Sequence, residues 1–245
     1  MKITFAIPAY NEEKNIAKCL ESVIKEIDRN NVEAEIIVID NNSIDNTSVI
    51  ANSFKSVKTV LEEKKGLPFA RQRGYLESTG ELIANIDSDT IMPNGWLKTV
   101  ISEFTKNEKL VGLSGPYRYY DLKPWCNFVT KLFYFAGYGT YIFNRFIIRR
   151  GSMMQGGNFI IKKTALDKIG GFNTKLKFWG EDTDIAMRLS KVGPVKFTFK
   201  LKMLTTGRRL MEEGVVKAGL RYIINYLYVI IKGSPKDNEY KDHRN

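Results

Sequence analysis

The sequence is poor in the residues that build disulfide frameworks and histidine metal sites. Its 245 residues include two cysteines, Cys19 and Cys126, and one histidine, His243. Two cysteines without metal-ligand spacing exclude a disulfide-rich secreted domain and a zinc finger, and they favour a reducing compartment. The N-terminus also lacks the long apolar segment and small-residue cleavage site of an export signal. We therefore expect a cytoplasmic protein.

Long apolar runs are also missing where the chain is most hydrophobic. Within the aromatic-rich residues 125–148, the longest charge-free run is residues 132–144, or 13 residues, whereas a membrane-spanning helix needs about 20. We expect a core or interfacial segment there. Residues 215–231 are apolar except for Lys217, Arg221 and Asn225. This pattern predicts either an amphipathic helix at the membrane surface or a helix docked on the domain itself.

Basic residues outnumber acidic ones. The chain has 38 Lys and Arg against 27 Asp and Glu, a net charge of +11. Such an excess suits nucleic acid, an anionic membrane surface or phosphorylated substrates. Nucleic acid is the least supported partner, because zinc-finger spacing, a recognition-helix pattern and an RNP-type aromatic motif are all missing from the sequence. Charge does not decide between the other two.

Apolar strand patterns alternate with helical patterns along most of the chain. The expected strands cover residues 2–9, 35–40, 57–61, 82–87, 110–117, 159–161 and 195–199. This alternation predicts an α/β fold with a mixed, mainly parallel sheet and helices on both faces. We expect one domain over residues 1–210, followed over residues 211–245 by an amphipathic C-terminal helix and a basic polar tail.

Polar residues follow three of these strands directly. Tyr10 and Asn11 follow the first strand, Asp40 and Asn41 end the second, and residues 87–89 (DSD) end the fourth. Ligands of open α/β sheets bind beyond the carboxyl ends of the strands, so these three clusters should converge. Two carboxylates one residue apart can hold a hard divalent cation, which in turn can hold nucleotide phosphates. Alone, the DSD sequence is more typical of a solvated turn, so the case for a metal site must come from its surroundings.

Six motifs occur in a recognisable order. They are IPAYNE at 7–12, VIDNNS at 38–43, ARQRG at 70–74, DSD at 87–89, GGN at 156–158 and WGED at 179–182. Together they resemble the motifs of family 2 glycosyltransferases, which have the GT-A (Rossmann-like) fold. The resemblance covers roughly residues 1–210. It implies inverting transfer of a sugar from a nucleotide-diphosphate sugar donor, with Mg²⁺ or Mn²⁺.

The resemblance assigns the nucleotide to the first half of the chain. It implies that Pro8 and Tyr10 form part of the nucleotide wall, with Asp40, Asn41 and Arg71 beside the base and ribose. Family members often have Asp at the position of Asn41. An amide both donates and accepts hydrogen bonds, whereas a carboxylate only accepts, so the identity of the base stays open.

The same resemblance makes Asp89, assisted by Asp87, the metal ligand that bridges to the donor diphosphate. A cation there stabilises the negative charge left by bond cleavage. Arg208 and Arg209 are expected to add positive charge at the same oxygens, although they would equally suit an exposed basic pair. Some GT-A enzymes recruit a later His to the metal. Because His243 lies in the tail, we expect the Asp residues, donor phosphates and water to complete the shell.

Asp182 resembles the catalytic base. An inverting reaction needs a carboxylate opposite the leaving group to accept the proton of the attacking hydroxyl. Its expected place at the start of a helix favours the ionised form, although an acid there also serves simply as a helix cap. Trp179 and Glu181 are expected at the acceptor and sugar. Gly157 and Asn158 join them, since paired glycines let a ligand approach the backbone closely.

These observations lead to one main function and several alternatives. The main expectation is a metal-dependent inverting glycosyltransferase acting on a hydroxyl of a glycan or lipid-linked glycan, with peripheral contact to the inner face of the cell membrane through residues 215–231. The alternatives are a polyprenyl-phosphate glycosyltransferase, whose ionised acceptor needs no base, and a sugar nucleotidyltransferase. A non-catalytic module that binds a nucleotide sugar or lipid is the third.

Overall fold

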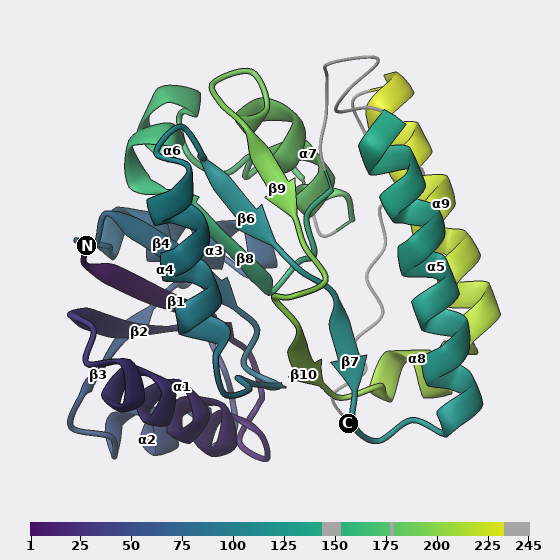
Figure 1. Cartoon of the computed structure of the whole chain (residues 1–245). Helices are drawn as coiled ribbons and strands as arrows, with labels where there is room; N and C mark the ends of the chain where they lie inside the picture. The colour runs from purple at the N-terminus through teal and green to yellow at the C-terminus, as the bar shows by residue number, and fades with distance from the viewer. Residues whose placement is uncertain (144–152, 177–178, 233–245) are drawn as a thin grey trace.

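A seven-stranded mixed sheet forms the centre of the molecule. The computed structural model describes residues 1–143, 153–176 and 179–232 (Figure 1). The strand order is β3-β2-β1-β4-β8-β6-β9. The strands are β1 (Ile3–Ala9), β2 (Ala34–Asp40), β3 (Val57–Leu61), β4 (Leu82–Ile86), β6 (Gly112–Ser114), β8 (Asn158–Lys162) and β9 (Val195–Phe197). Strand β8 is antiparallel to β4 and β6, and the other pairs are parallel. The expected mainly parallel α/β sheet is confirmed.

A second, smaller sheet is separate from the first. It consists of β5 (Thr90–Ile91), β10 (Met203–Thr205) and β7 (Tyr117–Tyr119), in that order. The expected single strand at 110–117 is therefore wrong, because the chain leaves the large sheet after β6 and joins the small one in β7. Gly115 makes this passage possible. A Cβ atom on Gly115 would lie 2.0 Å from the carbonyl oxygen of Leu201.

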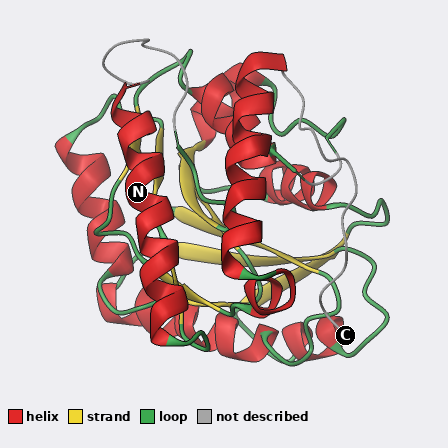
Figure 2. Cartoon of the chain, turned by 90° about the vertical axis from the view of Figure 1, so that its right-hand side faces the viewer, coloured by secondary structure: helices red, strands yellow, loops and turns green. Residues whose placement is uncertain are grey.

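Helices cover both faces of the large sheet (Figures 1 and 2). They are α1 (Ile16–Asn30), α2 (Thr47–Asn52), α3 (Leu67–Glu77), α4 (Trp96–Lys106), α5 (Pro124–Phe143), α6 (Lys163–Ile169), α7 (Glu181–Leu189), α8 (Arg208–Glu213) and α9 (Val215–Lys232). Most of them connect strands of the sheet, as the alternation of patterns predicts.

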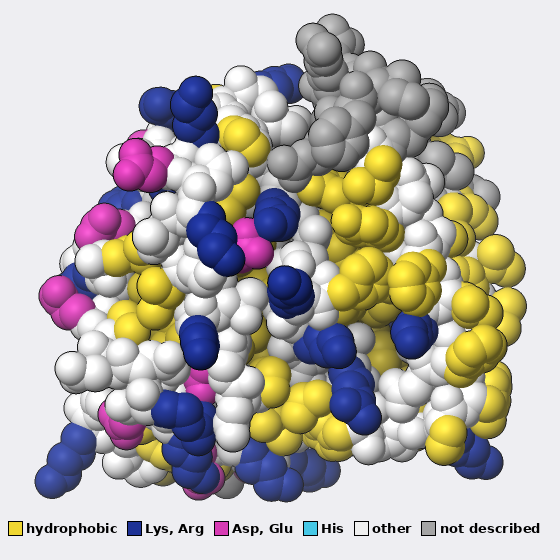
Figure 3. All heavy atoms as spheres, viewed as in Figure 1, with side chains coloured by type: hydrophobic (Ala, Val, Ile, Leu, Met, Phe, Trp, Pro, Cys, Tyr) yellow, Lys and Arg dark blue, Asp and Glu magenta, His cyan; other side chains and the backbone are white. Residues whose placement is uncertain are grey.

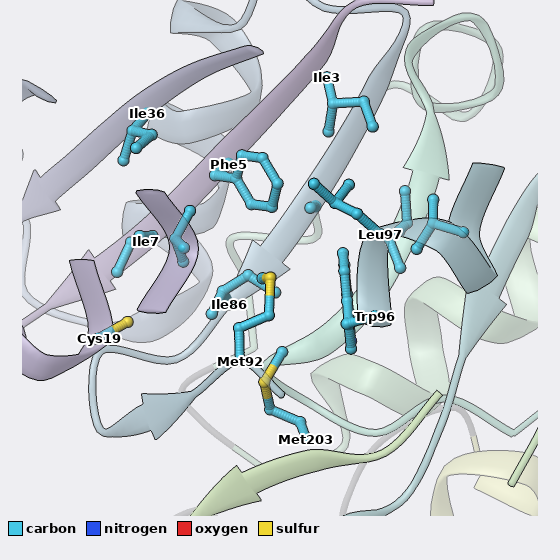
Figure 4. Close-up of a cluster of buried hydrophobic side chains, with 14 of the residues drawn as sticks. Ile3, Phe5, Ile7, Cys19, Ile36, Ile86, Met92, Trp96, Leu97 and Met203 are labelled. Atoms are coloured by element: carbon cyan, nitrogen blue, oxygen red, sulfur yellow. The ribbon is translucent and has the colours of Figure 1, made fainter. Parts of the chain in front are cut away.

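Two hydrophobic clusters hold these layers together, one on each face of the sheet. Because side chains alternate along a strand, Phe5 of β1 joins the cluster that includes α1 and α4, while its neighbour Ala6 joins the cluster that includes α3, α6 and α7. Figure 4 shows the first cluster, where Phe5, Ile86 and Trp96 lie among other buried side chains. A sheet covered on both faces leaves its strand ends as the natural place for polar chemistry.

Helices α5 and α9 lie side by side at one flank of the sheet (Figure 1). Val215 and Ala218 of α9 are buried against Leu122, Cys126 and Leu210, so α9 does dock on the domain. Among the described residues, no helix is long and apolar enough to cross a bilayer. The predicted domain boundary at residue 210 falls inside α8. Residues 144–148 of the aromatic-rich segment lie outside the described part of the chain.

Candidate functional site

The site lies at the carboxyl ends of β1, β2 and β4. These strands are parallel neighbours, so the residues that follow them meet at one edge of the sheet. Asp40, at the end of β2, pairs in register with Ala9, just before Tyr10. The DSD motif follows β4 in the same way.

Arg208 connects the residues that follow β1 with the DSD motif that follows β4. From the start of α8, its Nη2 atom donates hydrogen bonds to Oδ2 of Asp89 at 2.9 Å and to Oε1 of Glu12 at 2.8 Å. Glu12 is buried and also accepts a hydrogen bond from Nδ2 of Asn15 at 2.7 Å. One guanidinium is thus shared between two carboxylates from distant parts of the chain. This geometry holds a positive charge directly at Asp89.

Asp87 is held by three neighbours. The Tyr117 hydroxyl donates to its Oδ2 at 2.8 Å, and Nη2 of Arg71 lies 3.3 Å from its Oδ1. Gly157 packs against the same carboxylate with a φ of +73°, and a Cβ atom there would lie 2.0 Å from Oδ2 of Asp87. Gly157 therefore lets the Asp87 carboxylate approach the backbone closely, and its role at the sugar stays a prediction.

Arg71 links this pair to the acidic start of α7. Its side chain is 1% exposed, its guanidinium forms an ion pair with Glu181, and it lies over the Phe159 ring at 4.9 Å. We expected Arg71 beside the base and ribose. In the structure its described ion pairs are with Glu181 and Asp87, because α3 directs the side chain into the interior beside α7. Its place beside the nucleotide stays a prediction.

Asp182 occupies the first turn of α7, and its Oδ1 accepts a hydrogen bond from the backbone N–H of Thr183 at 2.8 Å. A helix start favours the ionised carboxylate. Burial nevertheless raises the pKa of Asp182, against the lowering effects of Arg71 and the backbone N–H groups. The expected preference of the helix start for the ionised form acts through these N–H groups, but the loss of water has the larger effect on the pKa.

Among the described residues, the site contains more acidic side chains than arginines to neutralise them. Glu12, Asp87, Asp89, Glu181 and Asp182 converge on Arg71 and Arg208. Burial, followed by repulsion from neighbouring carboxylates, raises the pKa of Asp89 to about 7, and burial raises that of Glu181 to about 7. Excess acid with hard oxygen donors fits a divalent cation at Asp87 and Asp89. Among the described residues, however, no preformed cluster of three His, Cys, Asp or Glu ligands is present.

The residues predicted to form the nucleotide wall lie at the ends of β1 and β2. Pro8 is buried within β1, and Tyr10 lies at its end with Nζ of Lys65 4.9 Å from its ring centre. Asp40 accepts a hydrogen bond from the backbone N–H of Ser43 at 3.0 Å. Asn41 is buried and forms three hydrogen bonds with the backbone of residues 62, 64 and 66. Its amide thus fastens the loop before α3, and its place beside the base stays a prediction.

Three other predicted site residues take part in contacts within the domain. Asn158 is fully buried, and its amide bonds to Trp96 and to the carbonyl oxygens of Gly115 and Leu201. Trp179 is 5% exposed and lies between Arg209 and Tyr222. Arg209 packs on Trp179 and pairs with Glu213. The fold uses each of the three in contacts within the domain, and their expected roles at the donor, acceptor and sugar stay predictions.

Two residues of the site did not appear among the candidates. Glu12 carried a signal, since it comes shortly after β1 just as Asp89 comes shortly after β4. Tyr117 carried none: it begins a strand of the second sheet, and only the fold brings it to Asp87.

Sequence comparison finds relatives along most of the chain. A family model described as glycosyl transferase family 2 matches residues 4–170, and one described as the N-terminal domain of galactosyltransferase matches residues 144–212. The probable glycosyltransferase YdaM of Bacillus subtilis is 27% identical over 205 residues, 78% of this chain and 47% of the relative. Poly-beta-1,6-N-acetyl-D-glucosamine synthase of Staphylococcus epidermidis is 27% identical over 178 residues, 71% of this chain and 42% of the relative. The chain thus spans about half or less of each.

Solved structures share the fold. The mannosyltransferase PcManGT from Pyrobaculum calidifontis, in complex with GDP-Man and Mn²⁺, matches 98% of this chain and 65% of its own chain, with a TM-score of 0.69 and 15% identity. The likeness confirms the expected GT-A fold.

Proposed function

The chain belongs to glycosyl transferase family 2, and on that premise we propose that it transfers a sugar, with inversion, from a nucleotide-diphosphate sugar to a hydroxyl of a glycan or lipid-linked glycan. One observation carries the proposal. Arg71 joins two acidic pairs, Asp87 with Asp89 and Glu181 with Asp182, in one site. Such an arrangement suits a reaction that needs a charged leaving group on one side and a base on the other.

The donor half consists of Asp87, Asp89 and Arg208. Asp89, assisted by Asp87, would hold Mg²⁺ or Mn²⁺, which supplies positive charge to the departing diphosphate. Arg208 already donates a hydrogen bond to Asp89, and its guanidinium would also interact with the same phosphates. Tyr117 and Gly157 fix the position of Asp87. A protein of the same fold that binds GDP-Man and Mn²⁺ supports this choice of ligands.

The acceptor half centres on Asp182. As a carboxylate it would accept the proton of the attacking hydroxyl while the new bond forms. The raised pKa makes the ionised form a stronger base than an ordinary aspartate, provided that the pH is high enough to ionise it. Arg71 and Glu181 position this part of α7 relative to Asp87.

The location of the reaction is part of the proposal. A lipid-linked glycan lies at a membrane, so we place the protein in the cytoplasm at the inner face of the cell membrane, in contact with it through residues 215–231. The net charge of +11 favours binding to an anionic membrane surface. We also keep, as a proposal, the division into a catalytic domain over residues 1–210 and a C-terminal helix and tail over residues 211–245.

A thermal-shift screen tests the donor site without knowledge of the acceptor. UDP, GDP, dTDP and CDP are added with and without Mn²⁺, because a ligand that binds only the folded state raises its stability by mass action. We expect a metal-dependent rise in melting temperature with one diphosphate. The rise should disappear in Asp89→Asn.

The matched control is Asp28→Asn, which makes the same chemical change at an exposed position at the end of α1. This variant should respond to the diphosphate as the wild type does. The proposal fails if no diphosphate shifts the wild type, or if Asp89→Asn responds in full.

A further inference from the structure

Helix α5 carries a stripe of large apolar side chains that face solvent. Trp125, Phe128, Leu132 and Phe135 are between 52% and 62% exposed. Their spacing of three, four and three residues puts them on one side of the helix. The stripe is too regular for scattered surface residues, and it continues to Ile142, which is 37% exposed.

Helix α9 extends this apolar surface. Val216, Leu220, Ile223 and Ile224 are between 40% and 54% exposed. The two helices are in close contact, since a Cβ atom on Gly219 of α9 would lie 2.4 Å from the ring of Phe133. Figure 3 shows hydrophobic side chains gathered on the right of the molecule, over α5 and α9. Patches of this kind on a folded protein mark an interaction surface.

The charges on the two helices are of one sign. Residues 124–143 and 215–232 contain no Asp or Glu. Lys131 on α5 and Lys217 on α9 are exposed, and Arg221 is partly exposed. Apolar and aromatic side chains with flanking cations suit a lipid surface with anionic headgroups. A second copy of the same surface would bring like charges together, which disfavours self-association.

We propose that α5 and α9 together form a membrane-binding surface, defined by the exposed apolar side chains above with Lys131 and Lys217, and that its partner is a bilayer leaflet rich in anionic phospholipid. The surface is wider than the segment 215–231 expected from the sequence, because α5 supplies its aromatic side chains. Tyr222 of α9 contacts Trp179, three residues before Asp182, so the surface adjoins the acceptor half of the site. The proposal does not depend on sugar transfer.

Trp125 makes the binding directly observable. Trp96 and Trp179 are 2% and 5% exposed, whereas Trp125 is 58% exposed. The full chain, without donor or metal, is mixed with vesicles of equal parts phosphatidylglycerol and phosphatidylcholine, and with vesicles of phosphatidylcholine alone. We expect the protein to sediment with the anionic vesicles, with a blue shift of tryptophan emission and quenching by brominated lipid. Trp125→Phe should still sediment but lose the shift.

Substitutions on the surface test its residues. Leu132→Glu should weaken binding to anionic vesicles at least tenfold, whereas Leu76→Glu, at a 64% exposed position on α3, should not change it. The double variant Lys131→Gln, Lys217→Gln should weaken binding to anionic vesicles and reduce the salt dependence of that binding. The control double variant Lys98→Gln, Lys168→Gln, on α4 and α6, should leave the binding and its salt dependence unchanged. Circular dichroism establishes that each variant is folded.

Three results would overturn the proposal. They are the absence of wild-type binding to anionic vesicles, equal binding by Leu132→Glu, and a lipid-free dimer in sedimentation velocity that Leu132→Glu dissociates. The last result would mean that a second copy covers the surface. Because these experiments contain no donor, their failure leaves the diphosphate screen unaffected.

Discussion

At the scale of single residues, Gly157 decides where Asp87 can lie. Its φ of +73° and the contact with Asp87 both require glycine. We predict that Gly157→Ala displaces the Asp87 carboxylate and abolishes the stabilisation by diphosphate and Mn²⁺ in the thermal-shift screen. Gly170→Ala is the matched control, because Gly170 has the same φ of +73° but open space around it. It should cost about 1–2 kcal/mol of stability and keep the ligand response. Equal responses would contradict this account of Gly157.

The raised pKa values of Asp89 and Glu181, each about 7, predict how stability depends on pH. Both carboxyls ionise less readily in the folded protein than in the unfolded chain, so the folded state holds more protons. The free energy of unfolding of the ligand-free protein should therefore fall as pH rises from about 5 to 8. Urea unfolding across this range should give a smaller fall for Asp89→Asn than for the wild type. The exposed control Asp28→Asn should keep the wild-type slope, and equal slopes in all three proteins would refute the prediction.

At the scale of elements, Asn41 connects the end of β2 to the loop before α3. Its amide donates to the carbonyl oxygens of Glu62 and Lys64 and accepts from the N–H of Gly66. An aspartate cannot donate, so Asn41→Asp should leave two carbonyl groups without partners and cost about 1–3 kcal/mol. Urea unfolding measures this cost. Asn42→Asp, at the exposed next position, should change stability little; an equal loss there would contradict the role of Asn41.

The elements also show what the sequence could predict. Apolar strands followed by polar residues, such as β2 with Asp40 and β4 with the DSD motif, were recognisable because strand pattern and turn chemistry are both local. The contacts of Arg208 and Arg209 could not be recognised from the sequence. Successive residues on a helix point about 100° apart, so only the position of α8 decides that Arg208 reaches Asp89 while Arg209 packs on Trp179. Tyr117 and Arg71 depend in the same way on contacts between distant segments.

At the scale of the whole molecule, the fold was predictable in class but not in its second sheet. The alternation of strands and helices predicted the large sheet and its two covered faces. The small sheet of β5, β10 and β7 joins three short segments from distant parts of the sequence, and no local pattern marks such strands. This sheet matters for the site, since β7 carries Tyr117 and β10 leads into α8 with Arg208.

We propose that one acidic pair holds the donor and that the other removes the acceptor proton. The most direct test is a time course by proton NMR, with the nucleotide sugar identified by the screen and an extract of membrane glycolipids as acceptor. The wild type should form a product with the opposite anomeric configuration to the donor. Asp182→Asn should bind the donor as the wild type does but react about 10²–10⁴-fold more slowly. A product with retained configuration, or an undiminished rate in Asp182→Asn, would contradict the claim, and the undiminished rate would favour an ionised phosphate acceptor.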